Sequence, residues 1–303
     1  MNEETYKLLA KDTESMRPDL TSALFEVLLQ TLILVLGFWL STGKLWIAGQ
    51  IILGIAFWRS FAILHACGHH AFSTKRRLDD VIGLSQSLFC FIPYYSWKFI
   101  HFDHHRWTGW LDLDPTMRNL EKGTSKFNLA ILNFCWKLWI PVISIHYIVT
   151  VFFTKNNSHR KLASVWGSIL FVLLAHGTTI YFLGWNYFRY FGLSSFIYLN
   201  LGDVSLLTQH VHLPMDHSRG SLVMPKRLWE QDQYSHTVEL PLWMTRWLVL
   251  GFNHHSLHHL FPTMPYYHSS KIKFQGKHTH QGWQWLKMAK SMKATDLIYS
   301  SSP

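Results

Sequence analysis

Long apolar runs alternate with polar segments along the whole chain. Residues 23–41 and 46–66 are each long enough to cross the roughly 30 Å hydrocarbon core of a bilayer as a helix. The short STGKL segment between them predicts a hairpin. A second hairpin is predicted for residues 163–185 and 187–209, which a short Gly-Trp-Asn turn joins. The hydrophobic pattern therefore predicts four transmembrane helices in two hairpins.

Three further apolar segments are less suited to crossing a membrane. Residues 81–95 are short and contain a proline, and residues 240–252 are shorter still. Residues 127–153 contain Lys137 and Pro141, which disfavour an unbroken span. We expect all three segments to lie in the membrane interface.

The composition agrees with residence in a membrane. Hydrophobic residues make up 49% of the 303 residues and charged residues only 15%, so the length is used for spans rather than for a second domain. We expect one all-α integral membrane domain over residues 1–303. The net charge of +10 comes from dispersed basic residues, which favours an anionic membrane face over nucleic acid as a partner. The three cysteines have no CxxC spacing, which argues against a disulfide framework and against thiolate metal sites.

Three histidine clusters stand out from this apolar background. They are HACGHH, from His65 through His69 and His70; HFDHH, with His101, His104 and His105; and HSLHH, with His255, His258 and His259. Residues three and four apart share a face of a helix, so each cluster presents several imidazoles together. Imidazole suits iron, copper, zinc and nickel, and this number of rings exceeds the need of one tetrahedral ion. The clusters predict a site for two metal ions, whereas isolated histidines such as His236 and His278 are expected to be packed, hydrogen-bonded or solvated.

The predicted topology brings the clusters to one side of the membrane. Lys75, Arg76 and Arg77 directly follow the second span, and basic residues at a membrane exit mark the cytoplasmic face. Because residues 81–95 do not cross, the second cluster stays on that face, and the third cluster returns to it if residues 127–153 also stay in the interface. We therefore expect a cytoplasmic helical cap that carries the histidine site.

Missing motifs narrow the kind of metal site. No glutamate has a histidine three residues later, which excludes the carboxylate-bridged di-iron bundles. The His-Glu-x-x-His motif of zinc proteases is also absent. An all-histidine site for two metals remains, and iron fits it best because zinc supplies no electrons.

The ordered histidine motifs resemble those of a known family. The run from HACGHH to HFDHH resembles the first two histidine boxes of the membrane fatty acid desaturases of the methyl-end type, the delta-12 and omega-3 enzymes with their hydroxylase and acetylenase relatives. LLTQHVHLP and HSLHHLFPTMPYYH resemble later segments of that family, so the resemblance covers about residues 55–118 and 200–270. It implies that two irons are bound by His65, His69, His70, His101, His104, His105, His255, His258 and His259, with His210 or His212 completing the set.

The resemblance also implies an activity. It implies O2-dependent formation of a double bond in a lipid-linked fatty acyl chain, on an endoplasmic reticulum, plastid or bacterial inner membrane. The sequence has no His-Pro-Gly-Gly motif and no Rieske-type pair of cysteine–histidine motifs, so a separate protein, cytochrome b5 or ferredoxin, would donate electrons. A di-iron hydroxylase, acetylenase or ketolase is the first alternative. A non-catalytic membrane metal-binding protein is the second, although its ligands would be expected near the middle of the bilayer rather than at span ends.

The chain departs from the family pattern after its first histidine, where Ala66 replaces the usual acidic residue. A carboxylate there could orient an imidazole, so the surroundings of that metal are expected to differ. Asp203 and Asn200 lie in the last predicted span, and Asp203 is seven residues from His210, so both are candidates for supporting a metal ligand.

Other polar and aromatic positions have simpler expected roles. Asp112 and Asp114 are expected to cap the next element rather than bind metal. Glu26 and Arg59, inside the first two spans, are expected to pair or to extend toward the interface. Aromatic residues such as Trp97 are expected to anchor the interface rather than to line an acyl tunnel.

Overall fold

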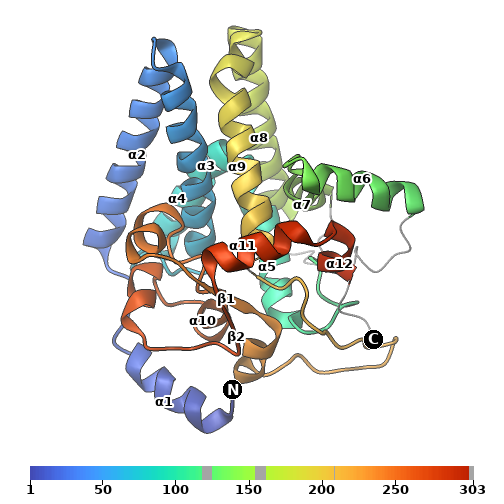
Figure 1. The fold of residues 1–303 in the computed structure, drawn as a ribbon. Helices are drawn as coiled ribbons and strands as arrows, with labels where there is room; N and C mark the ends of the chain where they lie inside the picture. Colours follow the sequence, from blue (N-terminus) through green and yellow to red (C-terminus); the bar gives the residue numbers. More distant parts are fainter. Residues whose placement is uncertain (118–124, 154–161, 208, 300–303) are drawn as a thin grey trace.

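The computed structural model describes residues 1–117, 125–153, 162–207 and 209–299. Figure 1 shows two tall helical hairpins beside each other, with the shorter elements gathered at one end of them. The α-helices are α1 Glu3–Thr13, α2 Leu20–Thr42, α3 Trp46–Gly68, α4 Arg76–Cys90, α5 Tyr94–Trp107, α6 Lys126–Lys137, α7 Val142–Phe153, α8 Leu162–Leu183, α9 Asn186–Leu207, α10 His255–Leu260, α11 Gly282–Ser291 and α12 Ala294–Tyr299.

The first hairpin matches its predicted bounds to within a few residues. Helix α2 begins after Asp19, whose carboxylate accepts a 2.7 Å hydrogen bond from the backbone N–H of Ser22 and so satisfies one of the free donors of the first turn. Helices α2, α3 and α8 are each long and apolar enough to cross a membrane. Three of the four predicted spans therefore have the length and composition of transmembrane helices.

Helix α9 is a different case. It has 22 residues and forms the second hairpin with α8, as predicted. Its sequence is less apolar than those of α2, α3 and α8, which are the described helices with the composition of a transmembrane span. Polar residues such as Arg189, Asn200 and Asp203 explain the difference. The prediction of four spans is supported for α2, α3 and α8 by both length and composition, and for α9 by length alone.

The predicted interfacial segments are broken into short elements. Residues 81–95 are divided between α4 and α5, with Phe91 in a left-handed conformation at the break. Residues 127–153 form α6 and α7, which meet at an angle of 118°. Residues 240–252 contain a single π-helical turn, Met244–Leu248.

Two short strands correct the expectation of an all-α fold. Strand β1, His236–Glu239, pairs in parallel with β2, His278–Gln281, in the register His236 to His278. The fold is therefore mostly helical, with 3₁₀ helices at Leu228–Tyr234 and Tyr266–Lys271 in the same region. Such four-residue strands carry too little apolar alternation to be recognised in the sequence.

Helix α3 is the centre of the core. It packs against α2, α4 and α9, and residues such as Leu53, Phe57 and Ile63 are fully buried. The expected pairing of Glu26 with Arg59 is confirmed, since a guanidinium nitrogen lies 3.1 Å from a carboxylate oxygen and both side chains are buried. Arg246, just before the third histidine cluster, donates to the same carboxylate. This ion cluster ties the first hairpin to the segment that carries α10.

Candidate metal centre

The C-terminal end of α3 separates the histidines of the first cluster. His65 and His69 are four residues apart and point to the same side of the helix. The helix then ends in a turn where the backbone N–H groups of His70 and Ala71 donate to Cys67 and Ala66, and His70 adopts a left-handed φ of 54°. The turn directs His70 elsewhere, where its Nε2 lies 3.2 Å from Nζ of Lys98.

The other two clusters each contribute histidines to two separate groups. On α5, His101 and His105 point one way and His104 points another, because positions four apart align whereas adjacent positions differ by about 100°. On α10, His255 and His259 align and His258 faces the opposite group. The sequence predicted these histidines as ligands, but it did not predict that each cluster would be divided between two groups.

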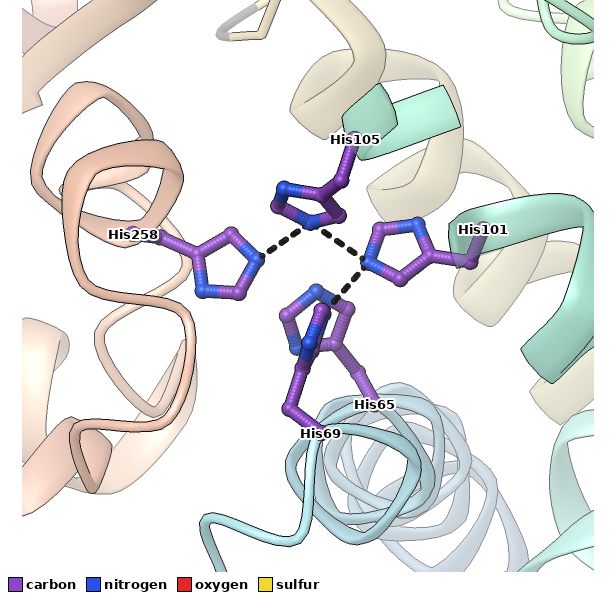
Figure 2. A group of neighbouring side chains, drawn as sticks. All are labelled: His65, His69, His101, His105 and His258. Atoms are coloured by element: carbon purple, nitrogen blue, oxygen red, sulfur yellow. Dashed lines mark hydrogen bonds between the residues drawn. The ribbon is translucent and has the colours of Figure 1, made fainter. Parts of the chain in front are cut away.

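Five histidines form the first group, named here the five-histidine group. Its members are His65, His69, His101, His105 and His258. The Nε2 atom of His101 lies 2.8 Å from that of His69 and 3.1 Å from that of His105, and the Nε2 atom of His258 lies 3.0 Å from that of His105. Figure 2 shows the rings from α3, α5 and the third cluster converging on one point.

Four buried histidines form the second group, the four-histidine group. Its members are His104, His210, His255 and His259. The Nε2 atom of His210 lies 2.8 Å from that of His255 and 3.1 Å from that of His259. His210 follows α9 and is buried, whereas His212 is exposed and lies in neither group. Of the eleven histidines predicted as ligands, the structure brings together nine and leaves out His70 and His212.

Both groups fit a metal ion. The ligand atoms in each lie within 4.8 Å of one another, slightly beyond the roughly 3–4.2 Å that separate imidazole nitrogens bound about 2.1 Å from one ion. Facing nitrogen lone pairs repel unless a proton or a cation lies between them. The two groups also adjoin, since the ring centres of His105 and His259 are 4.3 Å apart. The donor set therefore suits two neighbouring ions of an imidazole-binding metal such as iron.

Two of the histidines, one from each group, are held in the neutral form that binds metals. Burial, together with the nearby His104, lowers the pKa of His258 and of His210 to about 3 in each case. Both rings are therefore uncharged near neutral pH. Metal binding would then not require displacement of a proton from either ring.

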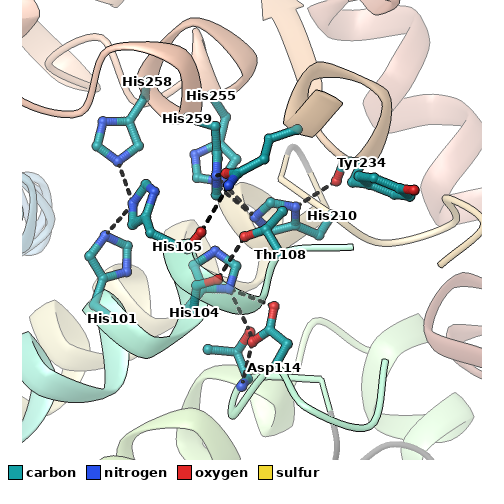
Figure 3. Close-up of polar contacts among 12 residues, drawn as sticks. His101, His104, His105, Thr108, Asp114, His210, Tyr234, His255, His258 and His259 are labelled. Atoms are coloured by element: carbon teal, nitrogen blue, oxygen red, sulfur yellow. Dashed lines mark hydrogen bonds and ion pairs between the residues drawn. The ribbon is translucent and has the colours of Figure 1, made fainter. Parts of the chain in front are cut away.

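Oxygen atoms hold the outer side of the four-histidine group (Figure 3). Nδ1 of His104 lies 2.8 Å from a carboxylate oxygen of Asp114, which is fully buried. Burial raises the pKa of Asp114, but interactions with His104 and Thr116 outweigh this and keep it below its ordinary value. Nδ1 of His259 lies 2.9 Å from the side-chain oxygen of Gln231. The sequence indicated neither partner, although an Asp-Pro-Thr turn shortly after a histidine cluster was a usable signal for Asp114.

The predicted supporting residues have other contacts. Asp203 accepts a 2.6 Å hydrogen bond from the backbone N–H of Ser144, in the first turn of α7. The side chain of Asn200 donates to the carbonyl of Phe196 and is directed along its own helix. The expectation that these two residues support a metal ligand is replaced by a role in helix packing, because α9 ends before His210 and its helical face does not continue to that residue.

An apolar cavity reaches both groups. His65 and His101 of one group and His104 and His210 of the other line it. The remaining wall is mostly apolar and comes from α3, α5, α7, α9 and the segment before α10, with Phe61, Trp97, Ile100, Val151, Tyr198 and Phe252 among its residues. Trp97 is buried and stacks on His101, so the expectation that it anchors the interface is wrong. Gly68 permits this packing, because a Cβ there would lie 2.7 Å from the Trp97 ring.

Comparison with known proteins identifies the family. The family model described as fatty acid desaturase matches residues 41–281, which include both histidine groups and the cavity. The chain belongs to the fatty acid desaturase family. Together with the apolar helices, this membership makes the chain a membrane protein of that family.

Several relatives of this desaturase-family chain are named for their double-bond position. The Delta(12) fatty acid desaturase FAD2 of Calendula officinalis is 28% identical over 260 residues, which are 74% of this chain and 62% of that protein. The Delta(12)-fatty-acid desaturase of Arabidopsis thaliana is 40% identical over 85 residues, 28% of this chain and 21% of that protein. The sn-1 acyl-lipid omega-3 desaturase (ferredoxin) of Nostoc sp. (strain 36) is 30% identical over 107 residues, 34% of this chain and 30% of that protein. The chain thus spans less than two thirds of the length of these relatives.

Proposed function

We propose that this chain is an O2-dependent desaturase that introduces a double bond into a lipid-linked fatty acyl chain, with two irons bound by the nine histidines of the two groups. One observation carries the proposal: an apolar cavity ends on histidines of both groups. An unactivated hydrocarbon chain has no polar group for an enzyme to hold, so its reacting carbons must be positioned by shape. A cavity lined by residues such as Trp97 and Phe252 has that property.

The protein residues would supply position and exclusion of water. Bound iron would supply the redox chemistry with O2 that an unactivated carbon–hydrogen bond requires. The nine imidazoles would hold two ions side by side, and Asp114 and Gln231 would keep the rings of His104 and His259 oriented. The buried aromatic wall would exclude bulk water from the reacting carbons and limit side reactions.

We also propose a membrane topology and an electron source. The turns of both hairpins lie at the end opposite to the histidine-bearing elements in Figure 1, and Lys75, Arg76 and Arg77 directly follow α3. These features support four spans in a single domain, with the site on the cytoplasmic face. Electrons would come from a separate acidic carrier, cytochrome b5 or ferredoxin, attracted by the net charge of +10.

Lipid analysis of a host with a simple fatty acid composition tests the proposed reaction. The chain is expressed with either electron carrier, and total fatty acids are examined by mass spectrometry. We expect a new fatty acid two mass units lighter than its precursor, in cells with the wild-type chain but not with His104→Ala. A product sixteen mass units heavier would instead support the alternative of a hydroxylase. No new fatty acid with either carrier would contradict the proposed function.

A further inference from the structure

The two histidine groups differ in what holds their outward ring nitrogens. In the four-histidine group, three Nδ1 atoms face an oxygen: His104 faces the carboxylate of Asp114 at 2.8 Å, His210 faces the backbone carbonyl of Tyr234 at 2.6 Å, and His259 faces the side-chain oxygen of Gln231 at 2.9 Å. Figure 3 shows the contacts of His104 with Asp114 and of His210 with Tyr234. An Nδ1–H that donates outward fixes the tautomer that leaves Nε2 free to bind a metal.

The five-histidine group lacks comparable support. The outward Nδ1 of His105 is buried without a hydrogen-bond partner. Within the described ranges, no ion pair joins a carboxylate to any of the five histidines, whereas Asp114 pairs with His104 of the other group. Among the described residues, the carboxylate charge that pairs with the proposed metal site therefore lies beside the four-histidine group.

Asp114 is fixed in place by contacts other than its histidine. Its second carboxylate oxygen accepts a 2.9 Å hydrogen bond from the backbone N–H of Thr116 and a 2.7 Å hydrogen bond from the Thr116 hydroxyl. Its own backbone N–H donates to Trp110 across a turn. Because the side chain is fully buried, its charge is costly unless a positive charge lies nearby. A cation bound by the four-histidine group would supply that charge through His104.

We propose that Asp114 makes the four-histidine group the tighter of the two metal positions, so that the first metal ion binds there and the second binds at the five-histidine group. A carboxylate that accepts the Nδ1–H of an imidazole makes its Nε2 a stronger donor, and loss of such partners typically lowers metal affinity by about 10–100-fold. Asp114 is thus a positioning residue that acts through His104. This inference rests on the proposed two-metal site and adds an order of loading to it.

Anaerobic titration of the purified, metal-free full-length chain with Fe(II) tests this order. Bound iron is measured by elemental analysis, and the environment of each iron by Mössbauer spectroscopy at one and at two equivalents. We expect the wild type to bind two irons in two phases with distinct spectra. In Asp114→Asn, the tighter phase should weaken by about 10–100-fold while the weaker phase keeps its affinity and spectrum.

Two further variants control for folding and local charge. Asp112→Asn removes a carboxylate two residues away that bonds to Ser218 rather than to a metal-facing ring, and both phases should stay unchanged. Thr116→Val keeps the Asp114 carboxylate but removes one of its supports, and should weaken only the tighter phase, by less than Asp114→Asn does. It also preserves the test if Asp114→Asn does not fold.

The outcomes separate this inference from the function on which it rests. Two irons in the wild type, with the same two affinities in Asp114→Asn and Thr116→Val, would overturn the order of loading and leave the two-metal site intact. A selective loss of the weaker phase would overturn it as well. A wild type that binds fewer than two irons would contradict the proposed function itself.

Discussion

The Nε2 atoms of His105 and His258 lie 3.0 Å apart, although 153 residues separate them in the chain. Histidine rings of helix α5 and of the short helix α10 thus lie side by side. Two neutral imidazole nitrogens this close are stabilised most strongly when a metal ion binds both of them. The second and third histidine clusters therefore meet in the folded chain.

Removal of His258 should abolish product formation without removing the protein from the membrane. His258→Ala deletes one ligand of the five-histidine group and leaves the four-histidine group intact. We expect new fatty acid to fall by at least about 100-fold, the upper end of the loss of metal affinity seen at weakened sites. His278→Ala is the matched control, because His278 lies in neither group. Wild-type product levels from His258→Ala at equal expression would count against its role.

Narrowing the cavity should impair use of the acyl chain but not metal binding. Val151 on α7 is fully buried and lines the cavity, so Val151→Trp should fill space needed by a hydrocarbon chain. We expect at least about a tenfold loss of product, since overpacking a closed site costs about 1–3 kcal/mol, with unchanged iron content. Val149→Trp, on an exposed part of the same helix, should keep wild-type activity. Equal activity of the two variants would show that the acyl chain lies elsewhere.

The ion cluster between the first two helices should be more important for stability than for chemistry. Arg59→Met removes one of the two guanidinium partners of the buried Glu26 and leaves it only Arg246, and breaking a buried pair typically costs about 3–5 kcal/mol. The double variant Glu26→Leu/Arg59→Met removes both fully buried charges and leaves only the partly exposed Arg246, so it should regain much of that loss. Thermal unfolding in detergent measures the difference. A double variant less stable than Arg59→Met would contradict this explanation.

Stability should also depend on pH through His236, which lies outside both metal groups. Burial, and to a lesser degree the nearby His280 and His278, lower the pKa of His236 from its ordinary value of 6.5 to about 4, and the carbonyl of Val211 opposes this shift. The unfolded chain therefore takes up the proton first, so stability is complete above about pH 6.5 and falls as the pH drops toward 4. His236→Gln should flatten this dependence by up to about 1.4 kcal/mol per pH unit. Parallel stability curves for both proteins between pH 4.5 and 7 would refute the assignment.

The sequence predicted most of the histidine site and missed its internal organisation. Spacing of three and four places imidazoles on a shared face, but it does not say which neighbouring helix that face will meet. The separation of His104 from His101 and His105 therefore became visible only with the packing of α5 against α10. His70 was predicted as a ligand but lies in neither group, because the turn that ends α3 directs it away from His65 and His69.

The fold, too, could be predicted only in part from the sequence. Helices α2, α3 and α8 have apolar runs of membrane length, so their bounds follow from composition alone. Strands β1 and β2 lie 42 residues apart in their paired register and have only four residues each, so no local pattern predicts their pairing. Asp114 was assigned only a capping role because its contact with His104 forms after the chain has left α5, beyond the reach of helical periodicity.

Iron content of the purified wild-type protein and of one ligand variant from each group tests the central claim most directly. His258→Ala removes a ligand of the five-histidine group and His259→Ala removes one of the four-histidine group. The two-group site predicts two irons per chain in the wild type and about one in each variant, with a different Mössbauer spectrum remaining in each. A single ion in the wild type, or two ions retained in both variants, would contradict it.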